Sequence, residues 1–107
     1  MSDSSIYMLN ALWFKPDGGE ARYRKYLAAT REVTDQLEIG AEVVNSYVPK
    51  EILIGNWNPD LVFFVRYPDR DAFNRLVTSK EYARVRHLRE EAIEDSVLVE
   101  CRPGPMG

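Results

Sequence analysis

The spacing of hydrophobic side chains changes several times along this 107-residue chain, and each change predicts a different element. Residues 6–14 and 61–67 are short, nearly continuous apolar runs rich in aromatic side chains, which is typical of strands. Between residues 20 and 37 apolar side chains recur at intervals of three and four, which predicts one face of an amphipathic helix. The Pro- and Gly-containing segment 15–19 predicts the turn before this helix, and Gly40 predicts its end.

The segment that follows the second of these runs predicts a helical region with one interruption. Thr78 and Glu81 have the spacing of a capping box, in which the Thr78 hydroxyl accepts a hydrogen bond from the Glu81 amide. We therefore expect two helices, over residues 69–77 and 79–94, joined by a kink.

Residues 42–54 have the least regular pattern. Their valines favour a strand, but Pro49 interrupts it, which places this segment at an edge, a bulge or a kink of a sheet. A last strand is expected at 97–101, followed by a flexible tail at 102–107. The order strand–helix–strand–strand–helix–strand is that of a ferredoxin-like α+β domain, with one antiparallel sheet and both helical regions on the same face. We expect residues 1–107 to form a single domain of this kind.

The two long strand runs are apolar on both faces. In the run 6–14 only Asn10 interrupts the apolar side chains, and in the run 61–67 only Arg66 does. Since the helices can cover only one face of the sheet, the other face needs a second surface. We predict a homodimer in which the sheets of two copies face each other. Asn10 and Arg66 fall in the same phase of their strands, so we expect both to line a barrel lumen or to form a hydrogen-bonded pair at the dimer interface.

Composition narrows the class of protein. Hydrophobic residues make up 45% and charged residues 29% of the chain, which is typical of a globular domain. The net charge of −3 argues against a nucleic-acid partner, and no apolar run is long enough to span a membrane. A single cysteine, Cys101, and a start without a basic, apolar leader favour the cytoplasm. One histidine and one cysteine make no cluster of metal ligands, so we expect neither a metal nor a cofactor.

Three segments carry a resemblance to a known family. They are Gly-Asn-Trp-Asn-Pro at 55–59, Tyr-Pro-Asp at 67–69 and Ser-Lys-Glu-Tyr-Ala-Arg-Val-Arg-His-Leu-Arg at 79–89. In these segments the chain resembles the DUF1330 family of the dimeric α/β barrel superfamily, although Lys80 and His87 stand where prolines are common in the family. The resemblance implies a ferredoxin-like monomer whose sheet pairs with a partner's to form a dimeric α/β barrel. It implies no reaction, because the family has no common activity.

The segment 79–94 carries the most specific candidates for a site. With residues placed about 100° apart on a helix, Arg89 falls among the apolar side chains and Arg86 at their edge, both on the side of Tyr82. His87 projects almost opposite, which favours an exposed histidine. An arginine that points inward needs an anionic partner. That partner is either a ligand's carboxylate or phosphate, or one of the chain's own carboxylates, for which the candidates are Glu51, Asp60 and Glu100.

These observations leave three functional hypotheses. The first is a homodimer that binds a small, hydrophobic, anionic ligand between sheet and helices. The second is a cofactor-free enzyme acting on a small metabolite, of the monooxygenase or isomerase type that occurs in the superfamily. The third is haem binding through His87. Packing alone also accounts for Trp57, as an anchor at the entrance of a strand, and for Tyr82, as a hydrophobic staple of its helix. The candidate ligand-binding residues are Tyr82, Arg86, Arg89, Trp57, Asn10 and Arg66.

Overall fold

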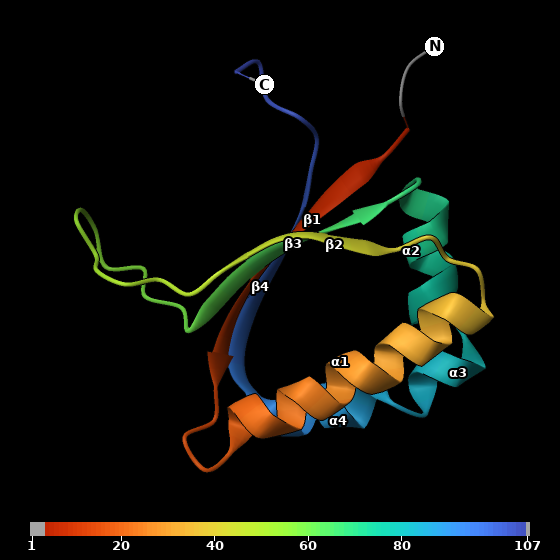
Figure 1. The fold of residues 1–107 in the computed structure, drawn as a ribbon, viewed down its shortest axis with the longest axis horizontal. Coiled ribbons are helices and arrows are strands. Elements are labelled where there is room, and N and C mark those ends of the chain that lie inside the picture. The colour runs from red at the N-terminus through yellow and green to blue at the C-terminus, as the bar shows by residue number, and fades with distance from the viewer. Residues whose placement is uncertain (1–3, 107) are drawn as a thin grey trace.

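The computed structural model describes residues 4–106 and contains one antiparallel sheet with helices on one of its faces (Figure 1). The elements, in chain order, are β1 (Ile6–Phe14), α1 (Gly19–Gln36), β2 (Glu42–Tyr47), β3 (Leu61–Tyr67), α2 (Arg70–Val77), α3 (Lys80–Ala83), α4 (Arg86–Ala92) and β4 (Ile93–Cys101).

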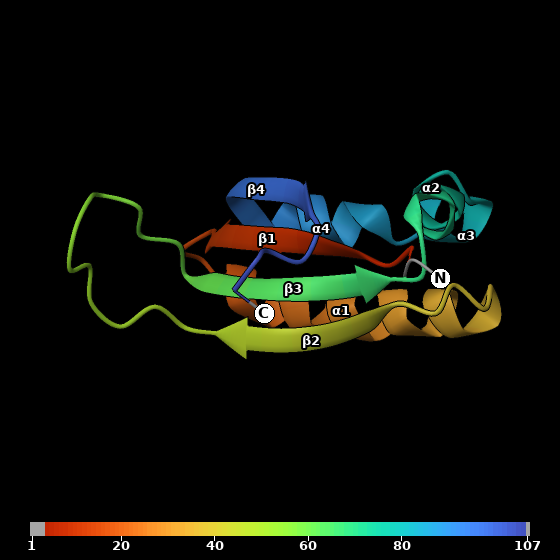
Figure 2. The ribbon, with the colours of Figure 1, turned by 90° about the horizontal axis from the view of Figure 1, so that it is seen from above.

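The strand order across the sheet is β2-β3-β1-β4, with every neighbouring pair antiparallel (Figure 2). The long apolar strands β1 and β3 therefore lie in the middle of the sheet, where both of their edges are hydrogen-bonded. The two crossovers, one through α1 and one through α2 to α4, return on the same side of the sheet. The predicted ferredoxin-like α+β fold is confirmed, and β1 and β3 have the predicted bounds. The expectation about the start of the chain falls partly on residues 1–3, which lie outside the described residues.

The second helical region differs from its prediction in its number of helices and in its cap. It forms three helices, because the chain leaves helical geometry again after α3. The N-cap of α3 is Ser79, whose Oγ accepts from the Tyr82 amide at 3.0 Å. Thr78 instead ends α2, and its hydroxyl donates to the carbonyl oxygen of Asn74 at 2.7 Å. A hydroxyl can donate and accept at once, as Ser79 Oγ does by also donating to the Leu76 carbonyl oxygen at 2.7 Å. The predicted Thr78 box is wrong because α3 begins at Lys80, which makes Ser79 and not Thr78 the residue before the helix.

The last strand begins earlier than predicted, at Ile93 rather than Val97. Ile93 pairs with Phe14 across a register shift, so β4 follows α4 without a loop. The helical pattern read through residue 94 missed this bend, because an apolar residue at a helix end and one at a strand start look alike in sequence.

The core lies between the sheet and the helices in two clusters. One cluster joins Met8, Val33 and Ile39 to residues of β3 and α2. The other joins Leu12 and Phe63 to tyrosines of α1. The predicted apolar face of α1 thus packs on the sheet, largely through tyrosines. Their hydroxyl groups need hydrogen-bond partners inside the protein.

Residues 48–60 form an extended arm that projects from the end of the sheet, away from the helices (Figures 1 and 2). Its base is fixed, because the Asp60 carboxylate accepts from the Phe14 amide at 2.8 Å and Trp57 packs edge-on against Trp13 at 6.0 Å between ring centroids. Its outer part exposes Leu53 and Ile54, at 84% and 96%. The arm thus holds two large aliphatic side chains in nearly full contact with solvent.

Candidate functional site

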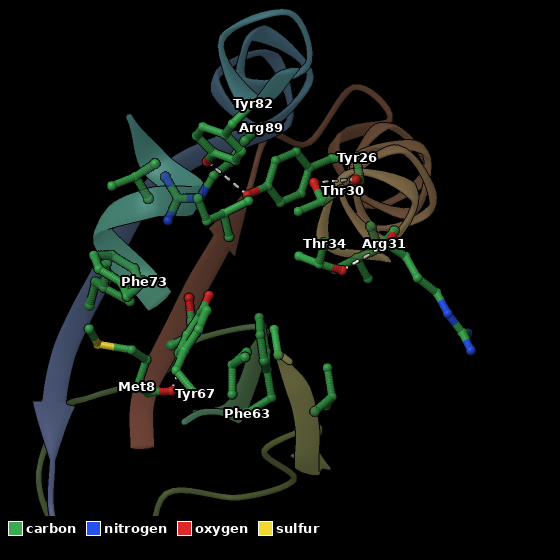
Figure 3. Close-up of a pocket in the computed structure, with 18 of the residues that line it drawn as sticks. Met8, Tyr26, Thr30, Arg31, Thr34, Phe63, Tyr67, Phe73, Tyr82 and Arg89 are labelled. Carbon is green, nitrogen blue, oxygen red and sulfur yellow. Dashed lines mark hydrogen bonds between the residues drawn. The ribbon is translucent and has the colours of Figure 1, made fainter. Parts of the chain in front are cut away.

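A cavity of about 430 Å³ lies between the helices and the sheet. Figure 3 shows aromatic side chains on both of its walls, with α1, α3 and α4 on one side and the strands on the other. Its volume falls in the range of sites for small organic molecules. Its lining includes Asn10, Tyr23, Tyr26, Thr30, Thr34, Phe63, Tyr67, Phe73, Tyr82 and Arg89.

Two tyrosine hydroxyls bridge the helical wall. Tyr26 lies on the buried face of α1, and Tyr82 is fixed at the start of α3 by the Ser79 cap. Their hydroxyl oxygens are 2.9 Å apart, and either can donate to the other (Figure 3). One proton of the pair makes this bond, which leaves the second proton for an acceptor in the cavity.

Tyr23 and Tyr67 are also buried, with 3% and 7% of their surfaces exposed. Neither hydroxyl has a hydrogen-bond partner among residues 4–106, and both side chains line the cavity. Burial raises the pKa of Tyr67 to about 12, with a smaller contribution from Tyr82. Burial likewise raises the pKa of Tyr23 and of Tyr26. All three are therefore protonated donors at neutral pH, not bases.

Arg89 supplies a positive charge inside the cavity, whereas Arg31, which also lines it, extends its guanidinium away from the other lining side chains (Figure 3). Arg89 lies on α4 and lines the same wall as Tyr82 (Figure 3). Its charge lowers the pKa of Tyr23, against the larger effect of burial. Within residues 4–106 no carboxylate forms an ion pair with Arg89.

The three carboxylates proposed as partners of Arg89 are used or placed elsewhere. Glu100 pairs with Arg70 at 2.8 Å, and Asp60 caps the base of the arm. Glu51 is exposed in the arm itself. An ion pair within residues 4–106 therefore does not account for the inward Arg89. The explanation that remains is an anionic group on a ligand.

The remaining polar groups of the cavity are mostly occupied. The hydroxyls of Thr30 and Thr34 donate to carbonyl oxygens of α1 at 2.7 and 2.9 Å. The Asn10 side-chain nitrogen donates to the Met8 carbonyl oxygen at 3.2 Å, which leaves its amide oxygen facing the cavity. The unused acceptors among the lining residues include the Asn10 amide oxygen and the exposed Glu42 carboxylate. The buried tyrosines and Arg89 are donors, so the interior of the cavity suits a ligand that brings acceptors of its own.

Of the candidate residues from the sequence, the structure brings Asn10, Tyr82 and Arg89 together at the cavity. Arg86 points to solvent, with 62% of its side chain exposed, and forms an ion pair with Glu90 at 3.6 Å. Trp57 belongs to the base of the arm.

Asn10 and Arg66 do not share a face, so that prediction is wrong. Asn10 is directly opposite Phe63, on the face under the helices, whereas Arg66 is opposite Tyr7 on the open face. Side chains alternate along a strand, and the difference between two strands' phases is set by their register, which the sequence alone does not give.

His87 is exposed, as predicted, and it does not line the cavity. The described residues also contain no group of three or more His, Cys, Asp or Glu side chains that could hold a metal ion. Neither observation adds support to the haem hypothesis.

Tyr23, Tyr26 and Tyr67 were missed as candidates. Their signal was present in the sequence, since two of the three stand on the apolar stripe of α1, where a tyrosine must place a hydroxyl inside the core. Which hydroxyls meet depends on the contact between α1 and α3. Tyr26 and Tyr82, which meet there, are 56 residues apart in the sequence.

A second hollow, at the base of the arm, lacks such features. It runs between Phe14, the start of α1 and Val48. Three of its charged side chains are engaged, with Glu20 paired to Arg24 at 3.3 Å and Asp60 bound to the backbone. No helix in the described part of the chain is both long and apolar enough to cross a membrane.

A ferredoxin-like domain with a donor-rich cavity between sheet and helices is the class that fold and site define. The sequence profile of DUF1330, a domain of unknown function, matches residues 18–101, and the chain belongs to this family. No curated protein matches it in sequence.

Solved structures agree on the fold. A protein of unknown function from Rhodopseudomonas palustris is similar with a TM-score of 0.83 and 29% identity, over 95% of this chain and 84% of that one. A putative antibiotic biosynthesis monooxygenase from Bacteroides thetaiotaomicron has a TM-score of 0.67 and 20% identity, over 94% and 90%. A dimeric ferredoxin-like protein of unknown function from Jannaschia has a TM-score of 0.70 and 11% identity, over 92% and 99%.

Proposed function

We propose that this chain is a homodimeric binding protein for a small, hydrophobic, anionic ligand, held in the cavity between sheet and helices. The observation that carries the proposal is Arg89, a guanidinium without an ion pair among residues 4–106 that lines a largely aromatic cavity. An arginine in such a position lowers stability unless an anion accompanies it. A ligand carboxylate supplies that anion and fits the planar donor fork of the guanidinium.

The walls specify the rest of the ligand. Phe63, Phe73 and the rings of the tyrosines offer flat apolar surface from both layers, which suits an aromatic or other planar ring. The unused tyrosine protons favour further oxygen atoms on it. An aromatic carboxylate satisfies all these features.

The test is a binding titration by calorimetry with benzoate, cinnamate and 2-naphthoate, on the wild type and on Arg89→Met. We expect at least one of these acids to bind the wild type and to lose about tenfold or more in affinity in Arg89→Met, because a charge-assisted hydrogen bond is lost. Arg86→Met is the matched control, since Arg86 lies on the same helix but outside the cavity. Equal affinity in Arg89→Met and the wild type would contradict the proposal, as would the failure of every acid to bind.

The homodimeric part rests on the open face of the sheet. Leu9, Phe64 and Val99 are neighbours on that face, across β1, β3 and β4, and no helix of the described chain covers them. A continuous apolar face of this kind is rarely left in water. The similar protein from Jannaschia is described as dimeric, which supports the same assembly here.

A second candidate function is cofactor-independent oxygenation. It is favoured by the similarity of fold to a putative antibiotic biosynthesis monooxygenase, and by donors that would stabilise negative charge on a substrate oxygen. The tyrosines do not supply a base at neutral pH, so this reaction needs a substrate that enters already ionised. Oxygen consumption with hydroxynaphthoates, measured against Arg89→Met, tests it; equal rates in both proteins would remove this candidate.

A further inference from the structure

The cavity holds more unused hydrogen-bond donors than one carboxylate can take from one side. On the helical wall they are Arg89 and the spare proton of the Tyr26–Tyr82 pair. On the sheet wall the Tyr67 hydroxyl, at the end of β3, is a donor without a partner among residues 4–106. The two sets belong to opposite layers of the fold (Figure 3).

Tyr67 is held firmly where it is. Its ring is 7% exposed and packs edge-on against Phe73, with 5.3 Å between the ring centroids. The packed ring therefore fixes where the hydroxyl lies, and its oxygen is accessible from the cavity rather than fully buried. A ligand that occupies the cavity meets this hydroxyl with whatever group lies on its sheet side.

We infer that the ligand carries, besides its carboxylate on Arg89, a second oxygen acceptor that receives the Tyr67 hydroxyl proton. The ligand class is then an oxo-substituted aromatic acid, with the carboxylate toward α4 and the carbonyl oxygen toward β3. This inference rests on the proposed binding of an aromatic carboxylate and adds the group that the protein recognises at the other end of the ring.

Tyr67 can distinguish ligands that carry an oxygen acceptor from ligands that carry an apolar group at the same position. A methyl group placed against the hydroxyl would leave the buried O–H without an acceptor, whereas a carbonyl oxygen would satisfy it. Two ligands of nearly the same shape separate these cases. In 4-acetylbenzoate a carbonyl oxygen stands where 4-isopropylbenzoate has a methyl group.

The experiment measures the affinity of both ligands, by calorimetry, for the wild type, Tyr67→Phe and Tyr47→Phe. We expect the wild type to prefer 4-acetylbenzoate by about fivefold, from one hydrogen bond gained and one unsatisfied donor avoided. Tyr67→Phe keeps the ring against Phe73, so it should bind 4-isopropylbenzoate at least as well as the wild type while losing the preference. Tyr47→Phe changes an exposed tyrosine outside the cavity and should keep it.

The possible results are distinct. Equal affinity of the wild type for the two ligands would overturn the inference, and so would a preference that persists in Tyr67→Phe. In both cases the binding of 4-isopropylbenzoate, lost in Arg89→Met, would still support the proposed function. If neither ligand binds the wild type while 2-naphthoate does, the inference fails alone; if no aromatic acid binds, both fail.

Discussion

Arg86 and Arg89 stand three residues apart on α4, yet one is in solvent beside Glu90 and the other lines the cavity without an ion pair. Replacing Arg89 by methionine removes the charge and keeps an apolar chain of similar reach. We expect Arg89→Met to raise the free energy of unfolding by about 1 kcal/mol, since an uncompensated charge near a core is destabilising. Urea denaturation measures the effect. Arg86→Met should change stability by less than about 0.5 kcal/mol, as exposed ion pairs contribute little.

The contrary result would be informative as well. A marked loss of stability in Arg89→Met would mean that the guanidinium holds the fold together. A gain in stability together with a loss of ligand affinity is the behaviour of a residue kept for binding.

The buried tyrosines set a limit to stability at high pH. Their folded-state pKa values lie above the usual value near 10, and that of Tyr67 is about 12. A raised pKa of this kind contributes stability that is fully present below pH 10 and is lost as the pH rises toward 12, because the unfolded chain then releases protons that the folded one retains. We expect the unfolding free energy to fall between pH 10 and about 12. It should fall less steeply in Tyr67→Phe, measured by urea denaturation over that range; an identical slope in both proteins would contradict the assignment.

At this scale the sequence predicts single positions better than pairs. The helical spacing of residues 79–94 was enough to place Arg89 inward and His87 outward. The helical spacing does not predict which residue each side chain contacts. The bond between Tyr26 and Tyr82 joins two elements that meet only in the folded chain, and the separation of Asn10 from Arg66 depends on strand register.

The shortest element, α3, is positioned by its cap. Ser79 Oγ accepts from the amide of Tyr82, the residue whose hydroxyl meets Tyr26. We expect Ser79→Ala to cost about 1 kcal/mol of unfolding free energy, the usual effect of losing an N-cap. Thr78→Ala should cost less than half of that, because the Thr78 hydroxyl donates to a carbonyl oxygen that also accepts from a backbone amide. Equal losses in urea denaturation would restore Thr78 as the cap.

The elements with long, uniform patterns were predicted with their observed ends, and those defined by short signals were not. β1 and β3 are continuous apolar runs bounded by turns, which leaves little choice of where each strand begins and ends. The region from α2 to β4 contains two breaks, after Val77 and after Ala83. At the first, a hydroxyl at 78 or 79 serves equally well in sequence. Only tertiary contact decides between such neighbours.

At the scale of the whole molecule, the open face and the arm form one apolar surface. Trp13 of β1 contacts Trp57 at the base of the arm, and the arm also exposes Leu53 and Ile54 almost fully. A monomer would leave both in water. In the proposed homodimer the two sheets cover each other. Each arm projects from the body of its own chain (Figures 1 and 2), so we expect it to contact the partner.

Val99 offers a substitution that separates assembly from folding. It lies on the open face of the edge strand β4 and is 43% exposed, so a glutamate there is tolerated by a single chain. In a symmetric interface the same patch occurs on both copies, so Val99→Glu buries two like charges at once, at a cost of several kcal/mol. We expect the wild type to sediment as a dimer at micromolar concentration and Val99→Glu as a monomer with unchanged far-ultraviolet circular dichroism. Ala28→Glu, on the exposed side of α1, should remain dimeric.

The arm allows the same assembly to be tested independently. Replacing Leu53 and Ile54 by serine removes apolar side chains that are 84% and 96% exposed, so the stability of an isolated chain should change by less than about 0.5 kcal/mol. If the arm packs on a partner, the same change removes two buried aliphatic side chains from each half of the interface, and the dimer should weaken by about tenfold or more. Sedimentation over a dilution series measures both species. A wild type that is monomeric at every concentration would refute the dimer, and a dimer that is unaffected by the arm substitutions would confine the interface to the sheet.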